Sequence, residues 1–264
     1  MRANARLGPV CALVVAAATG GLASCTEINA ASDHVAALEF DTLPAAAVVT
    51  GDTLRDSLGR AAPLKAIVFN GAGNVIAAAA VQYVALDTGV SISATGYLTA
   101  QRRSGTVRVV ANAGSLQSHA GTLIVARRPD SVFATGTLVD TLIYVVPDNV
   151  ATNASPELAV KVITRDTSGG IATTQGWLVS FQAFHAGAAI APGDTSVAYL
   201  LGTGTQRSRI DTTGTDGIAS RRLRVRPIGI TTVPDSVIVL ATVRYRGANV
   251  RGSPVRFVIL LRPK

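Results

Sequence analysis

The stretch Leu64-Lys65-Ala66-Ile67-Val68, followed by Gly71-Ala72-Gly73-Asn74, decides the fold class. Leu64, Ala66 and Val68 alternate with Lys65 and Ile67. Successive side chains of a strand point to opposite faces, so this half is predicted to be a strand. The glycines and the asparagine favour a turn in which a positive φ is cheap. Val81-Gln82-Tyr83-Val84 then resumes the strand pattern.

The second half of the chain repeats this plan. Leu158-Ala159-Val160-Lys161-Val162 alternates in the same way, the stretch 166–170 (Asp-Thr-Ser-Gly-Gly) supplies the turn, and Trp177-x-Val179-x-Phe181 supplies the next strand. Elsewhere short runs of Val, Ile, Leu and Thr are separated by Gly, Asp and Asn, with no apolar repeat at helical spacing. The sequence therefore predicts an all-β protein of two tandem β-sandwich domains, each with its own core.

Trp177, the only tryptophan, is in phase with Val179 and Phe181, while Ser180 and Gln182 alternate to the other face. Period-two alternation predicts that Trp177 lies in a sandwich core. The alternative is a surface platform that stacks on sugars, and the alternation favours the core.

Several motifs of the first half occur in an order typical of one family. They are Gly51-Asp52-Thr53, Leu64-x-Ala66, Gly73-Asn74-Val75, Val81-x-Tyr83, Gly96-Tyr97-Leu98-Thr99-Ala100 and Gly105-Thr106-x-x-Val109. This order resembles the bacterial Ig-like group 2 repeat of invasin- and intimin-type surface proteins. Departures from the family pattern are Tyr83, where tryptophan is frequent, and Ala85-Leu86, where the family is usually rich in serine.

In the second half, the stretch 211–219 (Asp-Thr-Thr-Gly-Thr-Asp-Gly-Ile-Ala) resembles a turn of the bacterial Ig-like group 1 family. The two resemblances imply Ig-like β-sandwiches at 35–128 and 129–264. The boundary is placed at Arg127-Arg128-Pro129-Asp130 because proline cannot donate to a β-ladder and keeps the preceding residue extended.

The N-terminus carries the pattern of an export signal. Arg2 and Arg6 precede an apolar run at 7–18, and Leu22-Ala23-Ser24-Cys25 follows. The four residues resemble the lipobox of bacterial lipoproteins, which implies cleavage before Cys25 and a lipid on that cysteine. The chain is then divided into a signal peptide at 1–24, a tether at 25–34 and the two domains, and it is held in the bacterial cell envelope by its lipid. The outer membrane is expected in a Gram-negative source because Thr26, rather than aspartate, follows the cysteine.

Composition and charge restrict the partners and the cysteine-dependent sites that we expect. Removal of Arg2 and Arg6 would lower the formal charge from +8 to +6, and a basic surface attracts anionic partners without specificity. Of the two cysteines, Cys11 would be removed with the signal peptide and Cys25 would carry the lipid. The mature chain would therefore have no disulfide and no cysteine-metal site. We predict no specific nucleic-acid binding.

No catalytic or metal-binding constellation is present in the sequence. His34, His119 and His185 are dispersed, and there is no Gly-x-Ser-x-Gly motif. The acidic stretch 211–216 has some features of a calcium loop, but it lacks the full ligand set, and a hairpin turn is favoured. We therefore predict no catalytic residue, no metal site and no cofactor.

The densest charge cluster is Arg221-Arg222-Leu223-Arg224-Val225-Arg226. In a strand, Arg222, Arg224 and Arg226 would share one face and could bind an anion such as lipopolysaccharide or phosphate. A solvated outer face that discourages edge-to-edge aggregation is the favoured interpretation.

We expect a non-enzymatic, lipid-anchored envelope protein that acts as an adhesion or surface-interaction module, with a protein or polysaccharide partner. A periplasmic structural or spacer lipoprotein is the alternative, and a carbohydrate-binding accessory protein is the third hypothesis.

Overall fold

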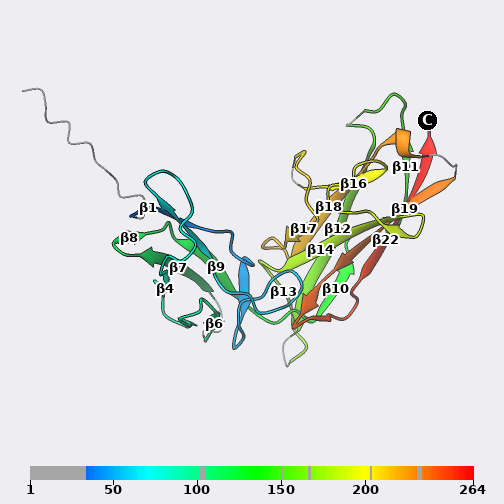
Figure 1. Ribbon diagram of the computed structural model, residues 1–264. Coiled ribbons are helices and arrows are strands. Elements are labelled where there is room, and N and C mark those ends of the chain that lie inside the picture. The colour runs from blue at the N-terminus through cyan, green and yellow to red at the C-terminus, as the bar shows by residue number, and fades with distance from the viewer. Residues whose placement is uncertain (1–33, 102–104, 150, 166–167, 203, 231–233) are drawn as a thin grey trace, which may run out of the picture.

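The computed structural model describes residues 34–101, 105–149, 151–165, 168–202, 204–230 and 234–264 (Figure 1). In these ranges the regular structure consists of β-strands and one short 3-10 helix, η1 (Pro227–Gly229), which confirms the predicted all-β class. No helix within them has the length and apolar character needed to cross a bilayer. The signal peptide, the lipobox Leu22-Ala23-Ser24-Cys25 and most of the predicted tether lie outside the described residues.

The first nine strands form one sandwich (Figure 1). Its largest sheet has the order β2 (Ala47–Val49), β9 (Gly121–Ala126), β7 (Gly105–Ala113) and β4 (Gln82–Ala85), with β8 (Leu116–Gln117) paired to β7. The opposite layer consists of two strand pairs, β1 (Val35–Phe40) with β3 (Ala66–Asn70), and β5 (Val90–Ile92) with β6 (Leu98–Ala100).

The later strands form a second, larger sandwich. One sheet has the order β10 (Ser131–Ala134), β12 (Ala154–Arg165), β18 (Ile218–Val225) and β16 (Ala198–Leu201), with β13 (Ile171–Thr173) on β12. The other has the order β11 (Val139–Tyr144), β22 (Val255–Pro263), β19 (Asp235–Thr242), β14 (Leu178–His185) and β15 (Ala188–Ala189), with β17 (Ile210–Thr212) on β14. A separate hairpin joins β20 (Arg244–Tyr245) to β21 (Ala248–Asn249).

The strand order of the second sandwich is that of an immunoglobulin domain. β10, β12, β18 and β16 occupy the places of strands A, B, E and D, and β14, β19 and β22 those of C, F and G. β11 runs parallel to β22. The first sandwich repeats this feature, since β2 runs parallel to β9 and the order β9, β7, β4 matches G, F, C. The predicted Ig-like β-sandwich type is therefore confirmed.

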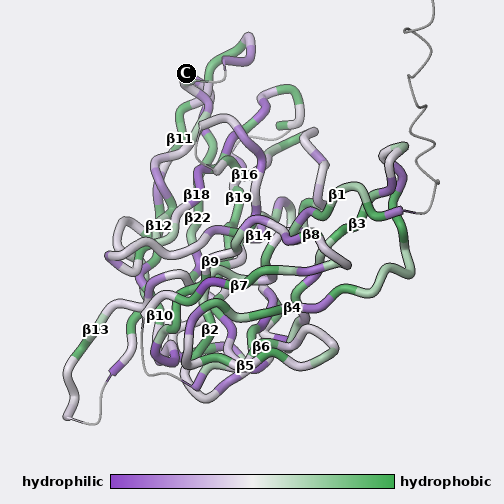
Figure 2. Tube along the Cα trace, turned by 90° about the vertical axis from the view of Figure 1, so that its left-hand side faces the viewer, coloured by the Kyte–Doolittle hydropathy of each residue, from purple (hydrophilic) through white to green (hydrophobic). Residues whose placement is uncertain are grey.

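Each sandwich encloses a core of its own. The first core includes Leu54, Leu98, Val107 and Leu123, each 0 % exposed, and Figure 2 shows the hydrophobic residues along β4, β7 and β9. The second core is larger. The two cores meet, because Val49 of β2 belongs to the second cluster and Leu178 of β14 packs against the first. Named strands of 35–126 pair only with one another, as do those of 131–263.

The alternation along β14 is as predicted. Trp177, just before the strand, is 8 % exposed, and Val179 and Phe181 are fully buried. Ser180 and Gln182 lie half-exposed on the other face. The assignment of Trp177 to a core is confirmed.

Candidate functional site

The most elaborate polar arrangement of the described chain lies where the two sandwiches meet, and we call it the joint. The second sandwich contributes the β20–β21 hairpin, whose turn residues Arg246 and Gly247 have φ of 51° and 80°. Positive φ at both central residues is the geometry of a two-residue turn that matches strand twist. Glycine takes this conformation freely, and Arg246 adopts it as the first residue of the turn, as Ala186 does in the β14–β15 hairpin.

The backbones of the two sandwiches approach each other closely at the joint. A Cβ placed on Gly59 of the first sandwich would lie 2.6 Å from the backbone nitrogen of Gly247. A Cβ on Gly176 would lie 2.9 Å from the Cβ of Ala47. Both distances are shorter than real contacts, so glycine is required at each position for the sandwiches to meet in this way.

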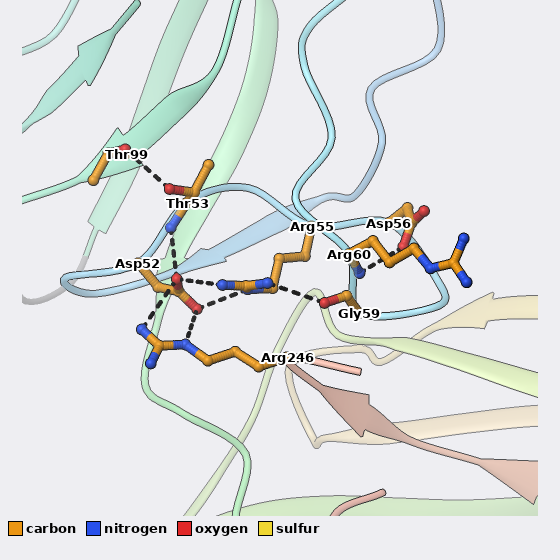
Figure 3. A network of polar contacts seen from close by, with 8 residues as sticks. All are labelled: Asp52, Thr53, Arg55, Asp56, Gly59, Arg60, Thr99 and Arg246. Atoms are coloured by element: carbon orange, nitrogen blue, oxygen red, sulfur yellow. Dashed lines mark hydrogen bonds and ion pairs between the residues drawn. The ribbon is translucent and has the colours of Figure 1, made fainter. Parts of the chain in front are cut away.

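Asp52 is the centre of the polar contacts (Figure 3). It is 6 % exposed and receives Arg55 from its own sandwich and Arg246 from the other. Arg55 donates from Nε and Nη2 to the two carboxylate oxygens, both at 2.8 Å. Arg246 donates to the same oxygens at 3.2 and 3.3 Å, and the Thr53 backbone N–H donates at 2.9 Å. Two bidentate arginines on one carboxylate make a directional link between the sandwiches.

The contacts of Asp52 govern its ionisation. Burial alone would raise the pKa of Asp52, but the hydrogen bonds from Arg55, Arg246 and Thr53 outweigh it and hold this pKa well below its usual range. The carboxylate is therefore charged at any ordinary pH. Burial, together with the hydrogen bond to Asp52, raises the pKa of Tyr245.

Aromatic rings complete the joint. The guanidinium carbons of Arg55, Arg128 and Arg246 lie 5.9, 5.2 and 5.4 Å from the Tyr245 ring centroid. The Trp177 ring lies 6.2 Å from the same ring. Cations over an aromatic face are attracted by its quadrupole, so Tyr245 helps to hold three positive charges beside one carboxylate.

The recess beside Asp52 leaves no room for a ligand. The recess between Val48, Asp52, Arg55 and Trp177 has a volume of about 10 Å³, close to the minimum that holds one water. Its groups are donors and acceptors already matched to one another. The arrangement is suited to fixing the relative orientation of the sandwiches.

The predicted arginine stripe on β18 needs a correction. Arg222 is exposed, Arg226 is 42 % exposed, but Arg224 is 1 % exposed. The loop between β11 and β12 folds over Arg224, which donates to Asp148 Oδ1 at 2.6 Å and to the Asn153 carbonyl at 3.1 Å. Strand alternation did not reveal this cover. The three side chains therefore do not form one solvent-facing stripe, and anion binding by Arg222 and Arg226 stays a prediction.

The acidic stretch at 211–216 runs from the end of β17 into a turn at 214–217. β17 pairs with β14 whereas β18 lies in the other sheet, so this turn connects the two sheets and is not the predicted hairpin. Asp216 Oδ1 accepts the Ile218 backbone N–H at 2.9 Å, and Gly217 has a φ of 75°. Asp211 instead pairs with Arg221 at 2.9 Å. In the part of the chain that is described, His, Asp and Glu side chains form no cluster of three suited to a metal ion.

A second feature is an unusual outer sheet surface, which we call the apolar face. Outward positions on β11, β22, β19 and β14 form a continuous row, since Val139 pairs with Val258, Val258 with Ile238, and Ile238 with Phe184. Ile143, Leu240 and Leu260 extend it, and Val139 and Ile143 are 55 % and 57 % exposed. Uncharged polar residues flank this row at other outward positions, namely Thr141, Ser180, Gln182, Ser236 and Thr242. The charged residues on its outward positions are Arg256 and Arg262, at the two ends of β22.

The sheet on the opposite side of the same sandwich, which contains β12 and β18, has a more polar outer surface. Its outward positions carry Glu157 paired with Arg222, Ala159 paired with Ser220, and Lys161. A sheet that faces water usually alternates apolar and polar residues. Charged and polar residues are spread over the outer surface of the β12–β18 sheet, which also exposes Phe133, whereas the middle of the apolar face carries none of the charged ones. Such an apolar row is typical of a sheet whose outer surface is covered.

Sequence reasoning missed the joint. In the sequence, Asp52 belongs only to the Gly51-Asp52-Thr53 motif of the Ig-like resemblance, and its partner Arg246 is 194 residues away. The one local signal is the Arg246-Gly247 pair between short strand patterns, which is compatible with a hairpin turn. Nothing in that signal points to Asp52.

No family model matches the sequence, and none of the curated proteins matches it. Solved structures that superpose on parts of the chain include the Yersinia pseudotuberculosis adhesin InvE, at 13 % identity and a TM-score of 0.30 over 85 % of this chain and 58 % of that one. Domains 5–6 of the S-layer protein SbsC match at 10 % identity and a TM-score of 0.27, over 88 % and 99 %. Mouse cadherin-23 EC22-24 matches at 12 % identity and a TM-score of 0.24, over 86 % of this chain and 64 % of that one. The chain spans a little over half the length of the adhesin, and the fold assignment rests on the strand order itself.

Proposed function

We propose that the chain is a non-catalytic, lipid-anchored envelope protein that binds another protein through the second of its two Ig-like sandwiches. The observation that supports this proposal is the apolar face. Outward Val, Ile, Leu and Phe side chains on four adjacent strands are costly to leave in water. Contiguous apolar surface of this kind marks protein interaction sites.

Anchoring would occur through Cys25, for which the support is the order of basic, apolar and lipobox residues in the sequence. Replacing Cys25 with Ala should leave an unprocessed precursor that takes up no labelled palmitate. A mutant that is still cleaved at the same bond and still labelled would rule out lipid attachment at this cysteine.

Binding through the apolar face is tested by photo-crosslinking in the producing cell. A benzophenone amino acid at Ile238 should give a protein adduct, whereas the same probe at Lys161, on the outer surface of the opposite sheet, should not. Adding Val258→Asp should abolish the adduct at Ile238, because a buried unpaired carboxylate is strongly disfavoured. Equal adducts from both positions would disprove the assignment of the face.

A spacer role is the second candidate, and the joint supports it. The paired charges of Asp52, Arg55 and Arg246 and the close backbone approach at Gly59 would keep the two sandwiches in one orientation. As an adhesion module the chain would bind its partner outside the cell, so protease treatment of intact cells separates this role from a periplasmic spacer. Degradation is expected for a surface adhesion module, and protection for a periplasmic spacer.

A further inference from the structure

The second sandwich is open along one edge, between β14 of one sheet and β16 of the other. A groove of about 330 Å³ lies there, which we call the edge groove. It is lined by β14, β16 and the segments 190–194 and 207–210. The strand that could close this edge, β15, has only two residues, and small side chains at Ala183, Ala191 and Gly193 keep the groove open.

The floor of the edge groove is the hydrophobic core itself. Ala183, Ile190 and Leu200 line it, and all three belong to the buried cluster of this sandwich, with exposures of 2, 8 and 4 %. Their side chains are aliphatic and offer no hydrogen-bond partner. The floor therefore favours an alkyl chain and disfavours a sugar or a free phosphate, whose polar groups would be left unpaired.

The mouth of the edge groove is cationic. Arg207 is exposed, and its guanidinium carbon lies 4.8 Å from the Tyr199 ring centroid. Arg209 donates to Gln182 Oε1 at 3.0 Å and to the Ile190 carbonyl. Among the described residues, neither arginine forms an ion pair with a carboxylate. Asp194 lies on the rim, and its Oδ1 accepts hydrogen bonds from the Ser196 backbone N–H at 2.9 Å and from the Ser196 hydroxyl at 2.8 Å.

From this combination we infer that the edge groove binds a free fatty acid, with the alkyl chain on the Ala183–Ile190–Leu200 floor and the carboxylate on Arg207. A guanidinium stacked on a ring keeps its edge N–H groups available for a bidentate contact with a carboxylate. The volume falls within the range of about 300–1,000 Å³ that small-molecule sites occupy. This ligand class lies beyond the proposed function, which uses a different face of the sandwich.

The test is titration of the full-length chain carrying Cys25→Ser, so that no lipid of its own is attached, with decanoate below its micelle concentration. Calorimetry should show saturable binding of decanoate. Butanoate has the same head group and 1-decanol the same chain, and each should bind at least tenfold more weakly. Butanoate binding as tightly as decanoate would show that the site recognises only charge, and would overturn the inference. Absence of decanoate binding would overturn it too.

Matched variants locate the site. Arg207→Gln should weaken decanoate binding at least tenfold, because the charged bidentate contact with the carboxylate is lost. Ala191→Trp, at an exposed lining position, should block the groove without touching the core. Arg256→Gln, an exposed arginine on the apolar face, is the control and should bind normally. Equal losses in the Arg207 and Arg256 variants would overturn the assignment.

The source of the ligand is tested with vesicles of phosphatidylglycerol. The Cys25→Ser chain should not sediment with them through Arg207. If it does so in an Arg207-dependent manner that decanoate cannot compete, the ligand is a membrane lipid rather than a free fatty acid, and the inference fails.

Discussion

Asp52 carries an unusually large share of the interactions at the joint, because one carboxylate balances two arginines from different sandwiches. Replacing Asp52 with Asn should lower the free energy of unfolding by about 2–3 kcal/mol, less than the roughly 3–5 kcal/mol of a fully buried pair because Arg246 is 58 % exposed. Urea denaturation measures the change. Asp87→Asn is the matched control, since its partner Arg108 is 56 % exposed and exposed pairs contribute about 0–1 kcal/mol. Equal losses in both variants would contradict a special role for Asp52.

The pH dependence of the joint follows from the same contacts. The pKa of Asp52 is lower in the folded chain than its ordinary value near 3.8. The stability that Asp52 contributes is therefore fully present above about pH 4 and is lost as pH falls toward the folded pKa. The difference between the wild-type chain and Asp52→Asn should be constant from pH 5 to 8 and should shrink below pH 4, as urea titrations at each pH can show. A difference that grew on acidification would disprove this sign.

At the scale of single elements, strand alternation predicted β12, β14 and the turn after Asp211 because each depends on neighbours in sequence. Alternation could not reveal that Arg224 is covered by a loop, since that cover comes from Asp148, 76 residues away. Nor could alternation predict that the outer surface of one sheet is apolar. The near-continuous run Phe257-Val258-Ile259-Leu260-Leu261 in β22 is the one local sign that both faces of that strand are apolar.

The Gly59 turn provides a sharp test of the joint. Gly59→Ala should destabilise the chain by at least about 1 kcal/mol more than Gly73→Ala, measured by thermal unfolding. Both glycines have a similar positive φ, 76° and 80°, so both variants have the same backbone strain. Only the Gly59 methyl group would meet another sandwich, at 2.6 Å from the nitrogen of Gly247, whereas nothing lies within 4 Å of a Cβ on Gly73. Equal losses would mean that the sandwiches separate readily.

Trp177 connects the β14 element to the joint through its ring contact with Tyr245. Truncation to Ala should cost about 3–5 kcal/mol, the range for a large aromatic lost from a packed core. The folded protein should show blue-shifted emission that acrylamide quenches poorly, because the side chain is 8 % exposed. Readily quenched emission with an unchanged melt would place Trp177 on the surface and would favour carbohydrate binding.

At the scale of the whole molecule, the separate core of each sandwich and the contacts of the joint act together. Each sandwich has the strand pairs and the buried cluster of an Ig-like domain, and the joint adds contacts that neither has alone. Val49 packs with the second core and Leu178 with the first. A partner bound to the apolar face would therefore be held at a fixed orientation relative to the first sandwich, which would lie nearer a lipid on Cys25.

Separate expression of the fragments 35–128 and 130–264 tests this organisation. Each should give a β-type circular dichroism spectrum and a cooperative melt, because its strand pairs are internal to it. The fragment 130–264 should melt below the intact chain, since without the first sandwich Trp177 and Leu178 lose apolar cover and Arg246 loses Asp52. Asp52→Asn in the intact chain should move the melt part of the way toward that of the fragment. If neither fragment melts cooperatively, the two sandwiches share a single folding unit, and the division at 128–129 is wrong.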